Sequence, residues 1–144
     1  MSPRDLDPDV VITRLRLIDD LITIMRGVGP LDRESLERDA ITRLAIERAL
    51  TQMVEMAVDV LNHLLVVSTG KTTRSYREAF VVAGREGILS RDLAASLDAA
   101  AGMRNILVHE YVDIDVGKVA DVTPLAPAAF SEFIHEVSVW VQAR

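Results

Sequence analysis

The chain has 144 residues, a length that predicts one domain with one core, spanning residues 1–144. Hydrophobic residues make up 49% of it and aromatic residues only 4%, so we expect an aliphatic core and an apolar surplus buried against a second copy of the chain. The absence of cysteine excludes disulfides, thiol catalysis and thiolate metal sites. The net charge of −6 excludes broad attraction to nucleic acid, so such a substrate would need a local basic groove.

The first residues carry acids where a secretory signal would need a basic and then an apolar run. No uncharged apolar stretch approaches the ~20 residues of a membrane span. We therefore expect a cytoplasmic protein.

Helical periodicity dominates and predicts an all-α fold, an up-and-down bundle of four to five helices. Asp7 and Pro8 predict the start of the first helix, which the glycine-rich residues 27–30 end. A longer helix is expected from about residue 35 through 67, with an apolar stripe wide enough for packing on two sides. Gly70 is expected to stop it.

The second half of the chain contains three further helix signals. Ser75 and Glu78 form a capping-box pattern that predicts a short helix up to Gly87. Ser90 is expected to cap the next helix. Residues 112–126 have little periodicity apart from a turn opened by Asp115, and Pro127 predicts the start of the last helix.

The end of the helix expected after Ser90 contains the groups best suited to phosphate chemistry. Arg104 is a permanent cation whose planar donor fork fits a phosphate. His109 can both take and give a proton near neutral pH, and Tyr111 adds a hydroxyl that can bind, donate or be modified. Helical spacing places Arg104 and Tyr111 on one face, with Asn105 and His109 on a neighbouring face.

One histidine in this segment is too few for RNA transphosphorylation, which needs a base for the 2′-hydroxyl and an acid for the leaving 5′-oxygen. A symmetric dimer would supply two histidines and two arginines around one groove, and the arginines would neutralise the charge of the phosphorane. No metal would be needed. Judged without reference to any known family, three such side chains on a helix more often form hydrogen bonds that serve only the fold than a catalytic site.

Two other polar groups are candidates for function. Glu55, Asp59 and His63 form one stripe on the long helix; a metal site is one interpretation, and a polar network that orients Arg104 or contacts RNA is favoured over it. An ordinary hydrogen-bonded set is the third. The densest basic cluster is either a rim for the RNA backbone or, on composition alone more often, a solvated face; its members are Lys71, Arg74, Arg77 and Arg85.

Residues 104–111, Arg-Asn-Ile-Leu-Val-His-Glu-Tyr, resemble the Arg-x4-His-x-Tyr motif of the HepT toxin family of HEPN-domain ribonucleases, also called DUF86. Residues 46–63 resemble the long second helix of that family, residues 75–80 its next segment and residues 112–115 its tail. Residues 82–87 are only loosely similar. The resemblance covers nearly the whole chain.

This resemblance implies a homodimeric, metal-independent ribonuclease that needs no cofactor, the toxin of a type VII toxin–antitoxin pair. Arg104 and His109 are then expected to be catalytic and to meet across the dimer interface. Auxiliary or RNA-binding roles are expected for Asn105, Tyr111, Asp59, His63 and Arg74. The implied partner is an MntA-type nucleotidyltransferase antitoxin that transfers AMP from ATP to Tyr111, where the added phosphates would occupy the anion site and repel RNA.

A non-catalytic helical module that assists a nucleotidyltransferase is the alternative function. The complete set of Arg104, His109 and Tyr111 favours the enzyme, whereas the acidic charge of the chain favours the module.

Overall fold

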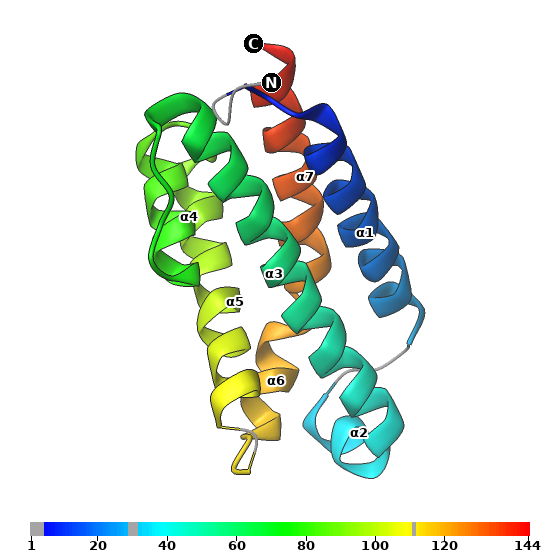
Figure 1. The fold of residues 1–144 in the computed structure, drawn as a ribbon. Helices are drawn as coiled ribbons and strands as arrows, with labels where there is room; N and C mark the ends of the chain where they lie inside the picture. Colours follow the sequence, from blue (N-terminus) through cyan, green and yellow to red (C-terminus); the bar gives the residue numbers. More distant parts are fainter. Residues whose placement is uncertain (1–4, 29–31, 111) are drawn as a thin grey trace.

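The computed structural model describes residues 5–28, 32–110 and 112–144, and every regular element within these ranges is a helix. The helices pack lengthwise into a bundle, with two short helices at one end (Figure 1). The predicted all-α bundle is therefore confirmed. In chain order the helices are α1 (Pro8–Gly27), α2 (Arg33–Arg38), α3 (Ala40–Thr69), α4 (Tyr76–Arg85), α5 (Arg91–His109), α6 (Val116–Val122) and α7 (Ala126–Gln142).

The helix ends follow the predicted capping residues. The side chain of Asp7 accepts a hydrogen bond from the backbone N–H of Asp9 at the start of α1, and Ser90 accepts one from Leu93 at the start of α5. Gly70 ends α3 in the left-handed conformation, with φ 79°, which a glycine adopts at little cost. These caps satisfy backbone groups that a helix end leaves without partners.

Two short helices add to the five longer ones that were predicted. Asp39 divides the expected helix of residues 35–67 into α2 and α3, because its carboxylate accepts hydrogen bonds from the N–H and the hydroxyl of Thr42 and so caps a new helix. The side chain of Asp115 likewise caps α6 through the N–H of Gly117, where only a turn was expected.

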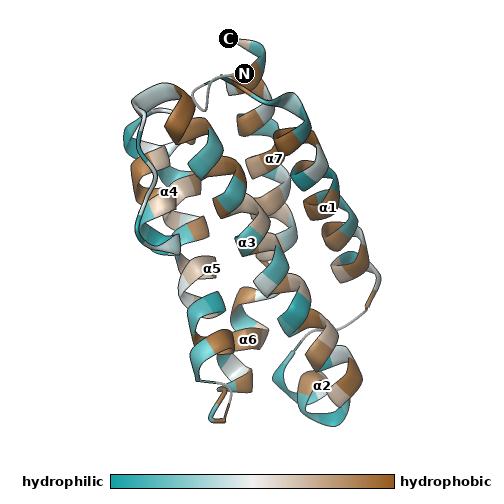
Figure 2. Ribbon diagram, viewed as in Figure 1, coloured by the Kyte–Doolittle hydropathy of each residue, from teal (hydrophilic) through white to brown (hydrophobic). Residues whose placement is uncertain are grey.

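Helix α3 lies in the middle of the bundle and contacts α1, α4, α5 and α7. Buried side chains therefore occur on more than one of its faces, as its wide apolar stripe predicts, and brown and teal segments alternate along it in Figure 2. Within the described ranges, α3 is the one helix long and apolar enough to cross a membrane. However, 56% of its apolar window is buried inside the bundle, and the core helix of a soluble protein passes the same test.

The segment between α3 and α4 positions the start of α4 beside the middle of α3. It folds back along α3, and the backbone N–H of Thr73 donates to Oδ1 of Asn62 at 2.9 Å. Helix α4 then runs antiparallel to α5, with Gly84 against Ala94 near the connecting turn. A Cβ atom at Gly84 would stand 2.9 Å from the Cβ of Ala94, so the glycine permits this close approach. The first residue of α4 consequently lies against the last third of α5.

Candidate active site

The side chain of Arg104 is held by three residues from three helices. Its Nη2 donates to Oε1 of Glu55 on α3 at 3.2 Å and lies 3.5 Å from the hydroxyl oxygen of Tyr76 on α4. Its Nη1 donates to Oδ1 of the neighbouring Asn105 at 3.3 Å. The guanidinium also stacks on the ring of Tyr76, 4.1 Å from the ring centroid. We call Arg104, Glu55, Tyr76 and Asn105 the arginine cluster.

The arginine cluster fixes the position of the Arg104 guanidinium, whose side chain is only 14% exposed. The carboxylate of Glu55, on a side chain that is 30% exposed, balances its charge, and the aromatic face of Tyr76 adds a cation–π contact. The Nε atom of Arg104 is buried and has no hydrogen-bond partner among the residues that the structure describes. Such an arrangement can present a guanidinium to an anion without first ordering a long side chain.

His109 is the last residue of α5 and is exposed. In the part of the chain that the structure describes, no group hydrogen-bonds to its ring. It borders a surface hollow of about 400 Å³ that is also lined by Glu110, Val112 and Asp113. Two carboxylates and the negative end of α5 surround this hollow, so its described lining residues include no arginine or lysine that could pair with a phosphate.

Arg104 and His109 point in different directions from the same helix. Five residues of α-helix correspond to roughly 140° of rotation and about 7.5 Å of rise. Arg104 accordingly lies against α3 and α4, whereas His109 is exposed at the end of α5. The two side chains of one chain therefore do not converge on a single phosphate.

The other predicted site residues lie in three places. Asn105 belongs to the arginine cluster. Arg74 is exposed two residues before Tyr76, and its backbone N–H donates to Oε2 of Glu78 at 2.9 Å. Tyr111 lies outside the described residues, so its shared face with Arg104 stays a prediction.

Asp59 and His63 contact the N-terminal part of the chain instead of the arginine cluster. Oδ2 of Asp59 pairs with Nε of Arg14 on α1 at 3.3 Å. Nε2 of His63 accepts a hydrogen bond from the backbone N–H of Asp7 at 2.9 Å. Only Glu55, the first member of the predicted stripe, reaches Arg104. No group of three or more His, Asp or Glu side chains within residues 5–28, 32–110 and 112–144 could hold a metal ion.

Tyr76 is the member of the arginine cluster that no sequence pattern indicates as a site residue. It is the first residue of α4, directly after the Ser75 cap, whose side chain accepts from the N–H of Glu78. The contact with Arg104 spans 28 residues of chain, so no helical spacing could reveal it. Its position after a capping serine was the one available signal.

The comparison with protein families agrees with this architecture. The family described as "Ribonuclease HepT-like" matches residues 15–137, which is most of the chain. The chain therefore belongs to the HepT-like ribonuclease family, and the resemblance found in its sequence is confirmed.

Two curated relatives and one solved structure are similar over most of their lengths. The tRNA nuclease HepT of Aphanizomenon flos-aquae is 27% identical over 95% of this chain and 93% of its own. The mRNA nuclease HepT of Shewanella oneidensis is 23% identical over 90% of this chain and 96% of its own. The solved structure is a tri-AMPylated HEPN toxin of Shewanella oneidensis in complex with an MNT antitoxin. It has a TM-score of 0.82 and 22% identity and covers 92% of this chain and 99% of that one, a likeness that shows the fold.

Proposed function

We propose that this protein is the toxin of a toxin–antitoxin pair, a cytoplasmic, metal-independent endoribonuclease that acts as a homodimer. The observation that carries the proposal is the pair of groups at the end of α5, a positioned guanidinium at Arg104 and an exposed imidazole at His109. Membership of the HepT-like ribonuclease family and the nuclease names of both curated relatives support it.

In the proposed reaction the ribose 2′-oxygen attacks the adjacent phosphorus and the bond to the 5′-oxygen breaks. One His109 accepts the proton of the 2′-hydroxyl, and a second His109, protonated, gives a proton to the leaving 5′-oxygen. The products are a 2′,3′-cyclic phosphate and a free 5′-hydroxyl. Arg104 stabilises the charge that develops on the phosphorane oxygens, so the reaction uses no metal ion.

The geometry of one chain favours a site shared between two chains. Arg104 and His109 diverge from α5, and the hollow beside His109 holds the carboxylates of Glu110 and Asp113. A second copy would supply Arg104 to the His109 of the first. Large apolar side chains near the same end of the bundle suit such a contact, since Ile41 is 82%, Leu44 58% and Val112 87% exposed.

We further propose that a nucleotidyltransferase antitoxin controls the toxin by transferring AMP to Tyr111. The structure of a tri-AMPylated HEPN toxin with its MNT antitoxin supports this form of control. Tyr111 follows His109 by two residues, so phosphates attached to it would lie close to the proposed groove. Their negative charge would compete with the RNA backbone for Arg104.

A ribonuclease assay with two substrates and a chelator tests the proposed function. We expect the purified protein to cleave RNA equally well with and without EDTA and to leave a 2′,3′-cyclic phosphate. An otherwise identical strand with 2′-deoxyribose throughout should stay intact, because it lacks the nucleophile. Loss of cleavage in EDTA, or cleavage of the deoxy strand, would contradict the mechanism.

The ion pair between Arg104 and Glu55 favours a second candidate, a non-catalytic module that assists a nucleotidyltransferase. An arginine that is 14% exposed and paired with a carboxylate can serve to hold α5 to α3. The module and the enzyme differ in one result, since a module would leave the RNA strand intact while still binding its partner.

Tyr76 supplies a prediction that is specific to the arginine cluster. Tyr76→Phe keeps the ring under Arg104 and should cleave RNA within about threefold of the native rate, since the hydroxyl contact is long, at 3.5 Å. Tyr76→Leu removes the cation–π contact and should lower cleavage about tenfold. Initial rates of both variants, with thermal unfolding as a control for stability, test this role. Equal rates for the two variants would show that the ring does not position Arg104.

A further inference from the structure

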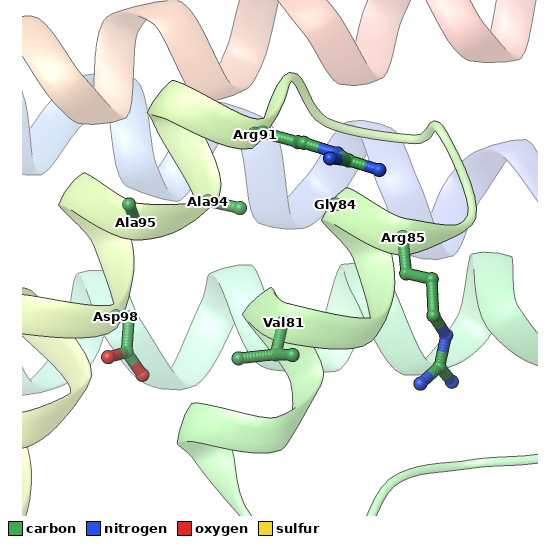
Figure 3. A pocket seen from close by; sticks show the side chains of 7 residues that line it. All are labelled: Val81, Gly84, Arg85, Arg91, Ala94, Ala95 and Asp98. Atoms are coloured by element: carbon green, nitrogen blue, oxygen red, sulfur yellow. The ribbon is translucent and has the colours of Figure 1, made fainter.

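A surface groove between α4 and α5 lies outside the candidate active site. It has a volume of about 380 Å³, within the range of small-ligand sites, and its lining residues are Val81, Gly84, Arg85, Arg91, Ala94, Ala95 and Asp98. Figure 3 shows Val81 facing the groove from α4, Ala95 and Asp98 on α5, Arg91 extending toward the turn between the helices, and Arg85 at the end of α4 with its side chain pointing away from that turn. The groove exists because small residues bring the helices together and leave space above them. Its floor is apolar, with Val81 56% exposed.

The groove is bordered by positive charges that carboxylates neutralise only in part. The guanidinium of Arg77 donates to both carboxylate oxygens of Asp98, at 3.0 and 2.7 Å, and these hydrogen bonds hold the pKa of Asp98 below its ordinary value. No carboxylate pairs with Arg91 in the described part of the chain. The closest carboxylate to Arg85 is that of its neighbour Glu86, at 3.9 Å. Residues 71–91 contain five cations and two acids in a chain whose net charge is −6.

One face of α5 connects the groove to His109. Arg91, Ala95, Asp98, Gly102, Asn105 and His109 follow one another at steps of three or four residues, which places them along one side of the helix. The guanidinium of Arg77 crosses this side at Gly102, with Nη1 3.6 Å from the position of a Cβ atom there. From Asp98 to His109 the helix rises about 16.5 Å, a distance that a few nucleotides of single-stranded RNA can span.

We propose that the groove binds an unpaired nucleobase of the RNA, a few nucleotides away from the bond that is cleaved. This inference rests on the proposed ribonuclease function. An apolar floor accepts the flat face of a base, and guanidinium groups both stack on bases and pair with phosphates. Arg85 and Arg91 contact the phosphates on either side of that base. A duplex would not fit, because its bases are stacked and paired away from such a floor.

Binding is measured with the His109→Ala variant, so that the RNA is not consumed. The probes are a fluorescein-labelled twelve-nucleotide oligouridylate and the same strand with abasic sites. The groove variant is a double substitution, Arg85→Gln with Arg91→Gln. The control is a second double substitution, Arg16→Gln with Arg26→Gln, which removes the same charge from two exposed positions of α1. Because α1 packs on α3 and α7, the control leaves the groove intact.

The groove variant should bind oligouridylate about tenfold more weakly than the control, and the slope of log affinity against log salt should fall by about 1.4. Abasic RNA should bind the control more weakly than oligouridylate does, because it lacks the stacked base, and the groove variant should lose less affinity for abasic RNA than for oligouridylate. Equal binding by the two double variants would overturn the base site. The base site is also overturned if the groove variant loses only its binding to the nucleotidyltransferase, or only its dimerisation, because a protein would then occupy the groove.

The failure of this inference is distinguishable from the failure of the proposed function. If the native chain cleaves RNA and the two double variants bind RNA equally, the base site is wrong and the ribonuclease stands. If only the groove variant loses binding to oligouridylate, but the native chain never cleaves RNA, the base site stands and the catalytic proposal is wrong. Absence of any RNA binding by the His109→Ala chain contradicts both.

Discussion

His109→Ala and Arg104→Lys are each expected to lower RNA cleavage at least a thousandfold. Alanine removes the imidazole at the end of α5 that accepts the proton of the 2′-hydroxyl in one chain and protonates the leaving 5′-oxygen in the other. Lysine keeps the charge of Arg104 but loses the planar fork that contacts Glu55 and Asn105 and that stabilises the phosphorane. Single-turnover cleavage of a labelled RNA measures both losses.

His135→Ala is the matched control for the loss of a histidine, because His135 lies on α7 and is not part of the arginine cluster. We expect that variant to cleave RNA at the native rate. His109 is exposed, so its replacement should also leave thermal unfolding unchanged. Full activity in His109→Ala, or equal losses in His109→Ala and His135→Ala, would remove His109 from the mechanism.

Incubation with a cognate nucleotidyltransferase, ATP and Mg²⁺ is expected to add AMP to Tyr111 and to reduce RNA cleavage to the background rate. Each AMP brings a phosphate that can pair with Arg104 of either chain and exclude the RNA backbone. Mass spectrometry of the protein and of its peptides identifies the modified residue. AMP on a different residue, or modification without loss of cleavage, would contradict this form of control.

Tyr111→Phe separates two roles of that hydroxyl. The variant keeps the ring and lacks the acceptor oxygen, so it must resist AMP transfer. If the hydroxyl serves only in regulation, Tyr111→Phe cleaves RNA at the native rate even after incubation with the nucleotidyltransferase. If cleavage falls before any incubation, the hydroxyl also contacts the scissile phosphate. Tyr76→Phe, which leaves Tyr111 in place, should still be modified.

Much of the fold was predictable because local rules determine helix ends. Asp7, Ser75 and Ser90 cap the helices that their positions predict, and Gly70 ends α3. The break at Asp39 was not predicted. Residues on both sides of Asp39 continue the helical pattern, so the sequence there looks like the interior of one helix. Only the hydrogen bonds of Asp39 to Thr42 show that a new helix starts.

The site was predictable only along α5, where motif residues are neighbours in sequence. The contacts from Arg104 to Glu55 and Tyr76 join residues 49 and 28 positions apart, which only packing of α3 and α4 on α5 brings together. Conversely, Asp59 and His63 share a stripe with Glu55 but turn to the N-terminal segment, because α1 packs on that side of α3. Spacing identifies a common face but not the neighbour that covers it.

The central claim is that one active site uses residues of both chains, with two His109 side chains in one groove. Mixing of the native chain with an equal amount of His109→Ala tests it most directly. After subunit exchange about a quarter of the dimers are native, about half are mixed and about a quarter carry the variant alone. A mixed dimer lacks either the base or the acid, so we expect RNA cleavage to fall to about a quarter of the rate of the same total amount of native protein. If Arg104 and His109 acted within one chain, each native chain would keep its own site, and the mixture would retain about half of that rate.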